Sequence, residues 1–299
     1  MRGRCTTVAV INFRSIEGAP ERNLPRMCEY TETAARQGAQ IILFPELALC
    51  GQGGGSGRCP QIQAAEAIPG PSSARMAEVA KRLAVYVIFG MPVRRKGFYY
   101  NSLVAFGPEG LLGVYDKLHL THLDRSWAAP GEALPLLLDT PYGRLLVSTG
   151  FETLYFPEIC RYGKAMEANL LLNAAAWTEQ EMAPAWQRML ERLCGCNTIP
   201  IATANLAGPG CMGGSHILSP AEPVEQICVL TGHTLAEGER TLPGMYLAAV
   251  DLSVDRLMPH YPYFEHNYKV GTPDWRPDVY ERMTSEILKN KPDGKDVLS

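Results

Sequence analysis

The chain has 299 residues, of which 46% are hydrophobic and 20% charged, and its formal net charge is −3. These values are ordinary for a soluble globular protein and give no reason to expect nucleic acid or an anionic membrane as a partner. No apolar run approaches the ~20 residues that span a bilayer, and the basic N-terminus lacks the apolar core of a signal peptide, so we expect a cytoplasmic protein.

Strand and helix patterns alternate along the first half of the chain. Apolar and β-branched runs predict strands, and apolar side chains at helical spacing predict helices. In chain order we expect a strand at 7–13, a helix at 24–39, a strand at 41–44, a glycine-rich loop at 51–57, a helix through 76–83 and a strand at 85–89. Two hairpins follow, one with strands at 99–106 and 112–115 and one with strands at 136–138 and 144–147.

The alternation continues in the second half and then becomes mostly β. We expect a helix at 158–167, a strand at 169–173, a helix at 179–193 and strands at 200–205, 215–218, 225–230 and 245–251. Two packed sheets with helices on their outer faces accommodate this α/β pattern. No linker divides the chain, so we expect one domain over residues 1–299, in which 260–299 forms an extended C-terminal arm with a frayed end.

The nine cysteines follow no framework spacing. In a chain of this length they indicate reduced thiols, several of them packed in the core. Cys194 and Cys196 form the only close pair, and His119 and His122 are a similar pair of histidines. Neither has the second pair of ligands that a zinc site needs, so we expect no metal and no cofactor.

Three charged residues stand at positions suited to catalysis. Glu46 follows a wholly apolar strand, where partial desolvation raises a carboxyl pKa and favours general-base work; the alternative is an ordinary strand-end carboxylate. Lys117 follows a hairpin, where a lysine can donate to an oxyanion or lower the pKa of a thiol; the alternative is a solvated surface lysine. Asp124 can pair with that lysine, or serve as a loop aspartate or helix cap.

Phe151 stands where the pattern calls for a nucleophile. Residues 147–158 predict a strand that enters a tight turn, followed by a helix that opens at Phe156. A turn of this kind presents its first residue at the rim of a sheet. Phenylalanine has no nucleophilic group, so the residue contradicts its surroundings.

Three segments occur in an order and spacing that resemble the nitrilase (carbon–nitrogen hydrolase) superfamily. They are LFPEL at 43–47, YDKLHL at 115–120 and FPE at 156–158, and the likeness extends to 173–177, 202–205, 214–220 and 275–280. The resemblance implies an αββα sandwich and hydrolysis of small amides, nitriles or carbamoyl compounds. It also implies a homodimer with stacked sheets and exchanged C-terminal arms.

The resemblance also implies roles for individual residues. The family uses a Glu-Lys-Cys triad, in which Glu takes the thiol proton, Cys attacks the carbon and Lys stabilises the intermediate. By motif, Glu46 matches the base, Lys117 the lysine, and Asp124 a second acid that the family usually supplies as Glu. Phe151 occupies the nucleophile position. The substrate pocket is expected to contain Asn173 and Trp177.

Other positions also depart from the family pattern. Gly51-Gln52 replaces the usual Gly-Tyr, and Cys196 aligns with a position that is often acidic. A replacement nucleophile is hard to find, because Cys160 lies nine residues after Phe151 in the following helix. Ser148 and Thr149 belong to the preceding strand, and their hydroxyls are poor nucleophiles without a matched base.

Two hypotheses follow from these residues. The first is a degenerate family member that keeps the sandwich and no longer forms a thioester, while it binds a small amide or acid, serves as a scaffold or partners an active paralogue. The second is an active amidase-type or nitrilase-type hydrolase in which Phe151 is engineered or erroneous, or the nucleophile has moved. An α/β enzyme of another class is disfavoured, since no dinucleotide fingerprint follows the first strand and no Walker motif occurs.

Overall fold

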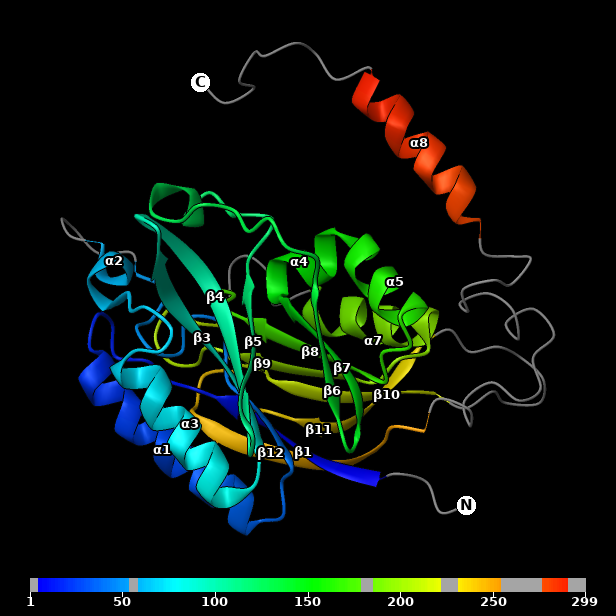
Figure 1. Ribbon diagram of the computed structural model, residues 1–299. Helices are drawn as coiled ribbons and strands as arrows, with labels where there is room; N and C mark the ends of the chain where they lie inside the picture. The colour runs from blue at the N-terminus through cyan, green and yellow to red at the C-terminus, as the bar shows by residue number, and fades with distance from the viewer. Residues whose placement is uncertain (1–4, 54–58, 179–184, 222–230, 254–275, 290–299) are drawn as a thin grey trace.

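The computed structural model describes residues 5–53, 59–178, 185–221, 231–253 and 276–289. They form two six-stranded mixed sheets that pack face to face, with helices on both outer faces (Figure 1). The predicted α/β sandwich is therefore confirmed. In this part of the chain no helix is long and apolar enough to cross a membrane.

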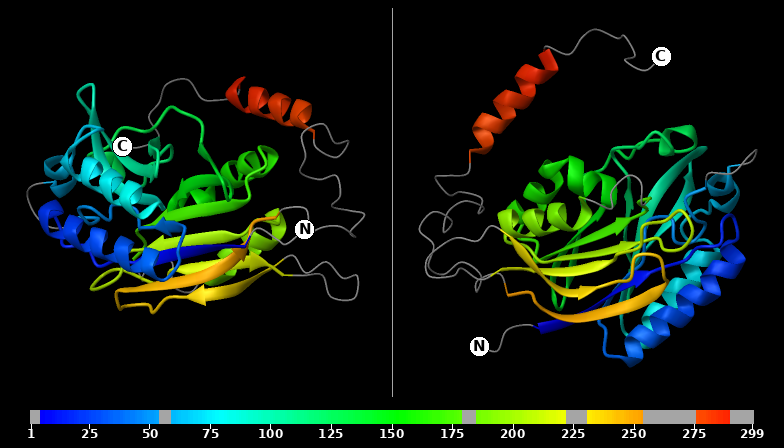
Figure 2. Two further views of the ribbon diagram at one scale, coloured as in Figure 1. Left: turned by 60° about the horizontal axis from the view of Figure 1, so that its bottom comes forward. Right: turned by 180° about the vertical axis from the view of Figure 1, so that it is seen from behind.

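The first sheet has the strand order β12-β1-β2-β3-β4-β5. Its strands are β1 (Cys5–Asn12), β2 (Ile41–Leu43), β3 (Tyr86–Arg95), β4 (Phe98–Gly107), β5 (Gly110–Asp116) and β12 (Gly244–Asp251). β1, β2 and β3 run parallel to one another, and the remaining pairs are antiparallel. Helices α1 (Pro20–Arg36) and α3 (Pro71–Leu83) cover the outer face, and the short helix α2 (Pro60–Ala64) contacts β3 (Figure 2).

The second sheet has the strand order β11-β10-β9-β8-β7-β6. Its strands are β6 (Leu136–Thr140), β7 (Gly143–Thr149), β8 (Leu170–Ala175), β9 (Ile201–Asn205), β10 (His216–Pro220) and β11 (Gly232–Glu237). β7, β8 and β9 are parallel. Helices α4 (Gly150–Tyr155), α5 (Pro157–Ala165) and α7 (Trp186–Asn197) cover its outer face (Figure 1).

Buried side chains alternate along the strands of the second sheet between two apolar layers. Leu145 and Val147 of β7 pack against the first sheet, whereas Leu146 between them packs under the helices. A strand buried on both faces gives a continuous apolar run with no polar alternation. The apolar run at 145–147 therefore predicts a strand, but it does not show which side chains face the other sheet and which face the helices.

Several elements differ from the prediction. β3 continues to Arg95 and joins β4 through Lys96 and Gly97, both with positive φ, as a tight hairpin turn requires. β11 was not predicted, and the strand expected at 225–230 lies outside the described residues. Within the segment expected to be an extended arm, residues 277–289 form helix α8 (Pro277–Lys289). The turn expected at Phe151 is the first turn of helix α4.

Candidate active site

Glu46 leaves the first sheet just after β2, at a place where two segments of backbone cross closely. A Cβ added at Gly90 of β3 would lie 2.2 Å from the Leu47 nitrogen and 2.6 Å from Glu46 Cα. Leu47 itself has a φ of 54°, a conformation that is strained for a residue with a side chain. Glycine at position 90 therefore lets the segment that carries Glu46 lie directly against β3.

Lys117 lies between two carboxylates. Its Nζ donates to Glu46 Oε1 at 2.6 Å and to Asp124 Oδ2 at 2.7 Å. Asn101 of β4 donates to the same two groups, to Glu46 Oε1 at 2.7 Å and to Asp124 Oδ1 at 2.9 Å. The side chain of Lys117 is only 2% exposed and those of Glu46 and Asp124 only 6%. The structure thus brings the three predicted charged residues into one buried cluster, which Asn101 completes.

The two carboxyl groups differ in their affinity for a proton. Burial, opposed by the attraction of Lys117, raises the pKa of Glu46 above its usual range, and the negative charge of Asp124 adds to the rise. Burial also acts to raise the pKa of Asp124, but the charge and hydrogen bond of Lys117 and two hydrogen bonds from Thr121 outweigh it and lower that pKa. Lys117 stays protonated, because the two carboxylates raise its pKa despite its burial. The cluster thus holds one firm ion pair and one carboxyl group that accepts a proton readily.

Phe151 lies in the first turn of α4, close to this cluster. The centre of its ring is 5.8 Å from Lys117 Nζ, within the range of a cation–π contact. The ring also packs against Tyr155 at 5.1 Å, Phe156 at 5.8 Å and Trp177 at 6.2 Å between ring centres. An aromatic group therefore neighbours the ammonium that the two carboxylates hold.

Glu152, the next residue, is fully buried and anchors the segment that carries Lys117. Its Oε1 accepts from the backbone nitrogens of Leu118 at 2.8 Å and His119 at 2.9 Å. Its Oε2 accepts from the hydroxyls of Tyr115 at 2.8 Å and Thr149 at 2.9 Å. Helix α4 is thereby tied to the end of β5, which fixes Lys117 relative to Phe151.

A family model described as carbon-nitrogen hydrolase matches residues 7–238, which include the whole cluster and Phe151. This chain belongs to the carbon-nitrogen hydrolase family. It is 29% identical over 290 residues to a probable nitrilase of Schizosaccharomyces pombe, across 92% of this chain and 98% of that protein. It is 30% identical over 196 residues to an omega-amidase of Homo sapiens, across 62% of this chain and 69% of that protein.

Solved structures of an amidase from Nesterenkonia sp. AN1 share the fold. One superposes with a TM-score of 0.72 and 21% identity, over 95% of this chain and 98% of that one. A mutant of the same amidase, with the acetamide moiety of fluoroacetamide added covalently at its active site cysteine, gives a TM-score of 0.72 at 20% identity, over 94% of this chain and 98% of that one.

The two predicted pocket residues of this carbon-nitrogen hydrolase chain lie in different surroundings. Trp177 follows β8, donates its backbone N–H to Asn205 Oδ1 at 2.9 Å and packs against Phe151. Asn173 lies within β8, fully buried, and neither atom of its amide has a hydrogen-bond partner. Of these two residues, Trp177 packs its ring against that of Phe151, at the nucleophile position. A substrate-binding role for either residue stays a prediction.

Sequence reasoning missed two polar residues that organise this family site. Asn101 interrupts the apolar strand β4, and Glu152 follows an apolar strand, so both could have been noted as polar residues in buried surroundings. Their partners could not be inferred, since Glu152 bonds to Tyr115 across 37 residues and Asn101 to Glu46 across 55. Among the described residues no three His, Cys, Asp or Glu side chains gather as a metal site.

Glu152→Gln tests whether Glu152 ties helix α4 to the end of β5. The substitution keeps the shape of the side chain but removes the charge that four well-formed donors share, so we expect a loss of roughly 1–3 kcal/mol in the free energy of unfolding. Denaturant titration measures this loss. The matched control is Glu158→Gln on the exposed side of α5, for which we expect a change within about 0.5 kcal/mol. Equal effects of the two substitutions would contradict an anchoring role for Glu152.

Glu46→Gln tests the raised pKa of Glu46. Between the unfolded and the folded pKa of this group, the folded protein binds more protons than the unfolded one, so raising the pH through that interval lowers stability. Glutamine keeps an oxygen for Lys117 and Asn101 but does not titrate. We therefore expect the free energy of unfolding of the variant to fall less than that of the parent as the pH rises from about 4. Parallel pH curves for the two proteins would contradict a raised pKa for Glu46.

Proposed function

We propose that this carbon-nitrogen hydrolase family member binds a small amide or carboxylic acid and does not hydrolyse it through a thioester. The observation that carries the proposal is the phenyl ring of Phe151, which occupies the predicted nucleophile position 5.8 Å from Lys117 Nζ. A phenyl ring offers no electron pair that can attack a carbonyl or nitrile carbon. Glu46 has no thiol there from which to take a proton.

The polar cluster supports recognition of such a ligand. Lys117 is a donor fixed by two carboxylates, and within the described chain Glu46 Oε2 accepts no hydrogen bond. An amide presents a carbonyl oxygen that accepts from an ammonium and an N–H that donates to a carboxylate. A carboxylic acid can share a proton with Glu46, whose pKa is raised. Either ligand fits the charges that remain beside Phe151.

Relocation of the nucleophile is disfavoured by the neighbouring side chains. Cys160 is 1% exposed in α5, and burial raises its pKa to about 12, so its thiol is not ionised at neutral pH. Thr149 donates its hydroxyl to Glu152, but that carboxylate already accepts from Tyr115 and two backbone nitrogens, and both residues are fully buried. Neither group meets a substrate as an activated nucleophile.

A second candidate function is an active amidase-type hydrolase in which Phe151 is engineered or erroneous. The observation that favours it is the intact cluster of Glu46, Lys117 and Asp124, with short hydrogen bonds on both sides of the ammonium. Sequencing the source gene at codon 151 distinguishes a native phenylalanine from an introduced one. A native phenylalanine removes this candidate.

An activity panel tests the proposal. The protein as it stands is assayed with short amides, nitriles and N-carbamoyl compounds, and binding of the same amides and their acids is followed by calorimetry. We expect binding of at least one short amide or acid, weakened by Lys117→Met, and no turnover. Turnover by the parent that disappears in Glu46→Gln would contradict the proposal that the protein binds its ligand without hydrolysing it. Turnover that instead disappears in Thr149→Val or Cys160→Ala would identify a relocated nucleophile.

We also propose one domain over residues 1–299 with a C-terminal arm over 260–299, a homodimer, and a cytoplasmic location. The pairing of β12 with β1 supports a single domain, since the last described strand of the chain completes the sheet that the first strand begins. Four large apolar side chains of helix α8 are exposed, as expected of a segment that docks on another surface: Tyr280, Met283, Ile287 and Leu288. Light scattering of the whole chain and of a chain ending at residue 253 measures whether the arm supports dimerisation.

A further inference from the structure

A row of polar side chains crosses the second sheet on the face that the helices cover. Ser148 of β7 pairs in register with Asn173 of β8, Asn173 with Thr203 of β9, and Thr203 with His216 of β10. Each lies two residues from an apolar side chain that packs under the helices: Leu146, Leu171, Ile201 and Leu218. Since side chains alternate along a strand, all four polar residues face the same helix-covered layer. They are at most 2% exposed.

Several polar atoms of this row are poorly paired within the protein. Both amide atoms of Asn173 and the hydroxyl of Thr203 make no hydrogen bond, and Nε2 of His216 has only the Glu237 carboxylate, at 3.4 Å. The hydroxyl of Ser148 has a single long contact, 3.5 Å to the Thr149 carbonyl. Folded proteins satisfy more than nine-tenths of their buried polar groups, with protein or with ordered water. Such groups on three adjacent strands call for one shared explanation.

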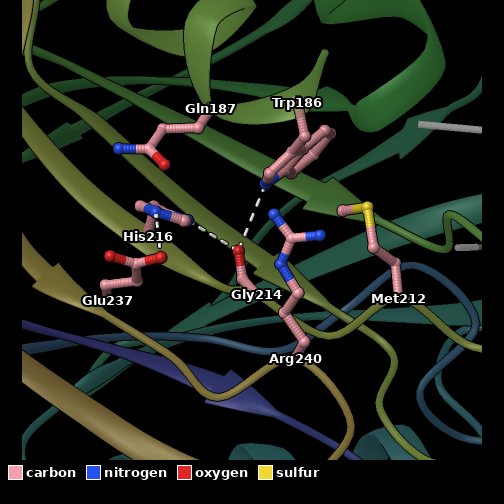
Figure 3. Close-up of a pocket in the computed structure, with 7 residues that line it drawn as sticks. All are labelled: Trp186, Gln187, Met212, Gly214, His216, Glu237 and Arg240. Carbon is pink, nitrogen blue, oxygen red and sulfur yellow. Dashed lines mark hydrogen bonds and ion pairs between the residues drawn. The ribbon is translucent and has the colours of Figure 1, made fainter. Parts of the chain in front are cut away.

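The row reaches the surface at its β10 end. His216 and Glu237 of β11 are register partners, and together with Trp186 and Gln187 they line a small surface pocket (Figure 3). The ring of His216 is buried, and its Nε2 lies 3.4 Å from Glu237 Oε1. Figure 3 shows the ring between the Glu237 carboxylate and the Gly214 carbonyl, which His216 Nδ1 contacts at 2.7 Å.

The other end of the row lies at the base of helix α4. Ser148 is two residues before Gly150, where that helix begins. A Cβ added at Gly150 would lie 2.7 Å from Trp177 Nε1, and this indole nitrogen is a further buried atom without a partner. The row of poorly paired polar groups therefore extends from His216 at the surface pocket to the helix that carries Phe151.

We propose that this row is a buried hydration site, a file of ordered water molecules that enters at the His216 pocket and ends beneath α4. The atoms include donors and acceptors, as water requires, and the inner three residues carry no charge that would select an ion. Neighbouring strands of a sheet lie about 4.8 Å apart, so one water above the sheet can bridge polar side chains of two strands with hydrogen bonds of about 2.8 Å. The site holds water through Asn173 and Thr203 and lies outside the Glu46–Lys117 cluster.

Thr203→Val tests the proposal, because valine keeps the shape of threonine and removes the hydroxyl. Long-lived internal water is counted by magnetic relaxation dispersion of the solvent, and the midpoint of thermal unfolding is measured on the same samples. We expect the variant to lose at least one long-lived water and its midpoint to fall by about 2–4 °C. The control is Thr31→Val, whose buried hydroxyl donates to Met27 O at 2.8 Å, and which should leave the water count unchanged.

Two outcomes overturn the hydration site. An unchanged water count with a higher midpoint means that the row is dry and the hydroxyl of Thr203 is unpaired in solution. An unchanged count with a lower midpoint means that Asn173 and Thr203 bond to each other directly. Should Thr203→Val fail to fold, Ser148→Ala removes the hydroxyl at the inner end without adding volume, and the same two readouts apply.

Discussion

Phe151→Cys is expected to give turnover of short amides where the parent shows none, at a rate at least ~10²–10³-fold above the parent background. The new thiol would stand in the first turn of α4, beside Lys117, whose charge stabilises a thiolate. Glu46 would take the thiol proton and pass it to the departing amine as the C–N bond breaks. Water would then hydrolyse the thioester and regenerate the thiol. Product release is followed as ammonia formed per enzyme.

The matched control is Phe151→Ala, which removes the ring without supplying a nucleophile. Alanine opens the space beside Lys117, so we expect tighter binding of short amides than in the parent and no turnover. Adding Glu46→Gln to the cysteine variant should abolish the gain. Equal rates for the cysteine and alanine variants, both folded, would mean that the surroundings of position 151 have drifted as well as the nucleophile.

The charged members of the site were identified from the sequence, whereas their geometry was not. Glu46 and Lys117 stand in short motifs at fixed places after apolar strands, and a strand end is a local property that an apolar run reveals. The hydrogen bonds that hold these two residues come from other elements of the fold. Asp124 reaches Lys117 from a short 3-10 helix, and Asn101 reaches both carboxylates from the middle of β4.

The second sheet shows the main limit of sequence reasoning. A substrate-pocket role for Asn173 stays a prediction. The face of β8 on which Asn173 lies could not be predicted, because it depends on parity within a strand that is apolar on both sides. In the structure its neighbours Leu172 and Ala174 face the first sheet, which turns Asn173 toward the helices. The two faces of such a strand can be told apart only when one face is polar or when the register is known. The run LLLNAA has no polar face, and its register cannot be predicted from the sequence.

Helix α4 was missed for a related reason. Six residues are too few for a helical period to stand out, and Phe156 with Pro157 suggested that the helix begins later. What holds α4 in place is tertiary: Gly150 packs against Ala175, and Glu152 accepts hydrogen bonds from β5 and the segment after it. Such long-range contacts override local propensity and leave little trace in the sequence.

Lys117→Met is expected to cost about 3–5 kcal/mol of the free energy of unfolding at neutral pH. Methionine fills a similar volume but leaves Glu46 and Asp124 buried beside each other, with hydrogen bonds from Asn101 and Thr121 and no neutralising charge. The comparison is Lys81→Met on the exposed face of α3, which should change stability by less than about 0.5 kcal/mol. Denaturant titration of both variants and the parent measures the difference.

The pH dependence of this loss separates lost charge from lost packing. Without the ammonium, desolvation and mutual repulsion raise the folded pKa of both carboxyl groups above the unfolded value, so the variant is most stable when both are protonated and loses stability as the pH rises. The gap between parent and variant should therefore narrow as the pH is lowered toward about 4. Adding Glu46→Gln and Asp124→Asn to Lys117→Met should recover much of the stability at neutral pH, since no buried charge then remains. A difference in the free energy of unfolding that is instead constant with pH, and unaffected by Glu46→Gln and Asp124→Asn, would contradict this account. That result would mean that Lys117 stabilises the fold through its packing and not through its charge.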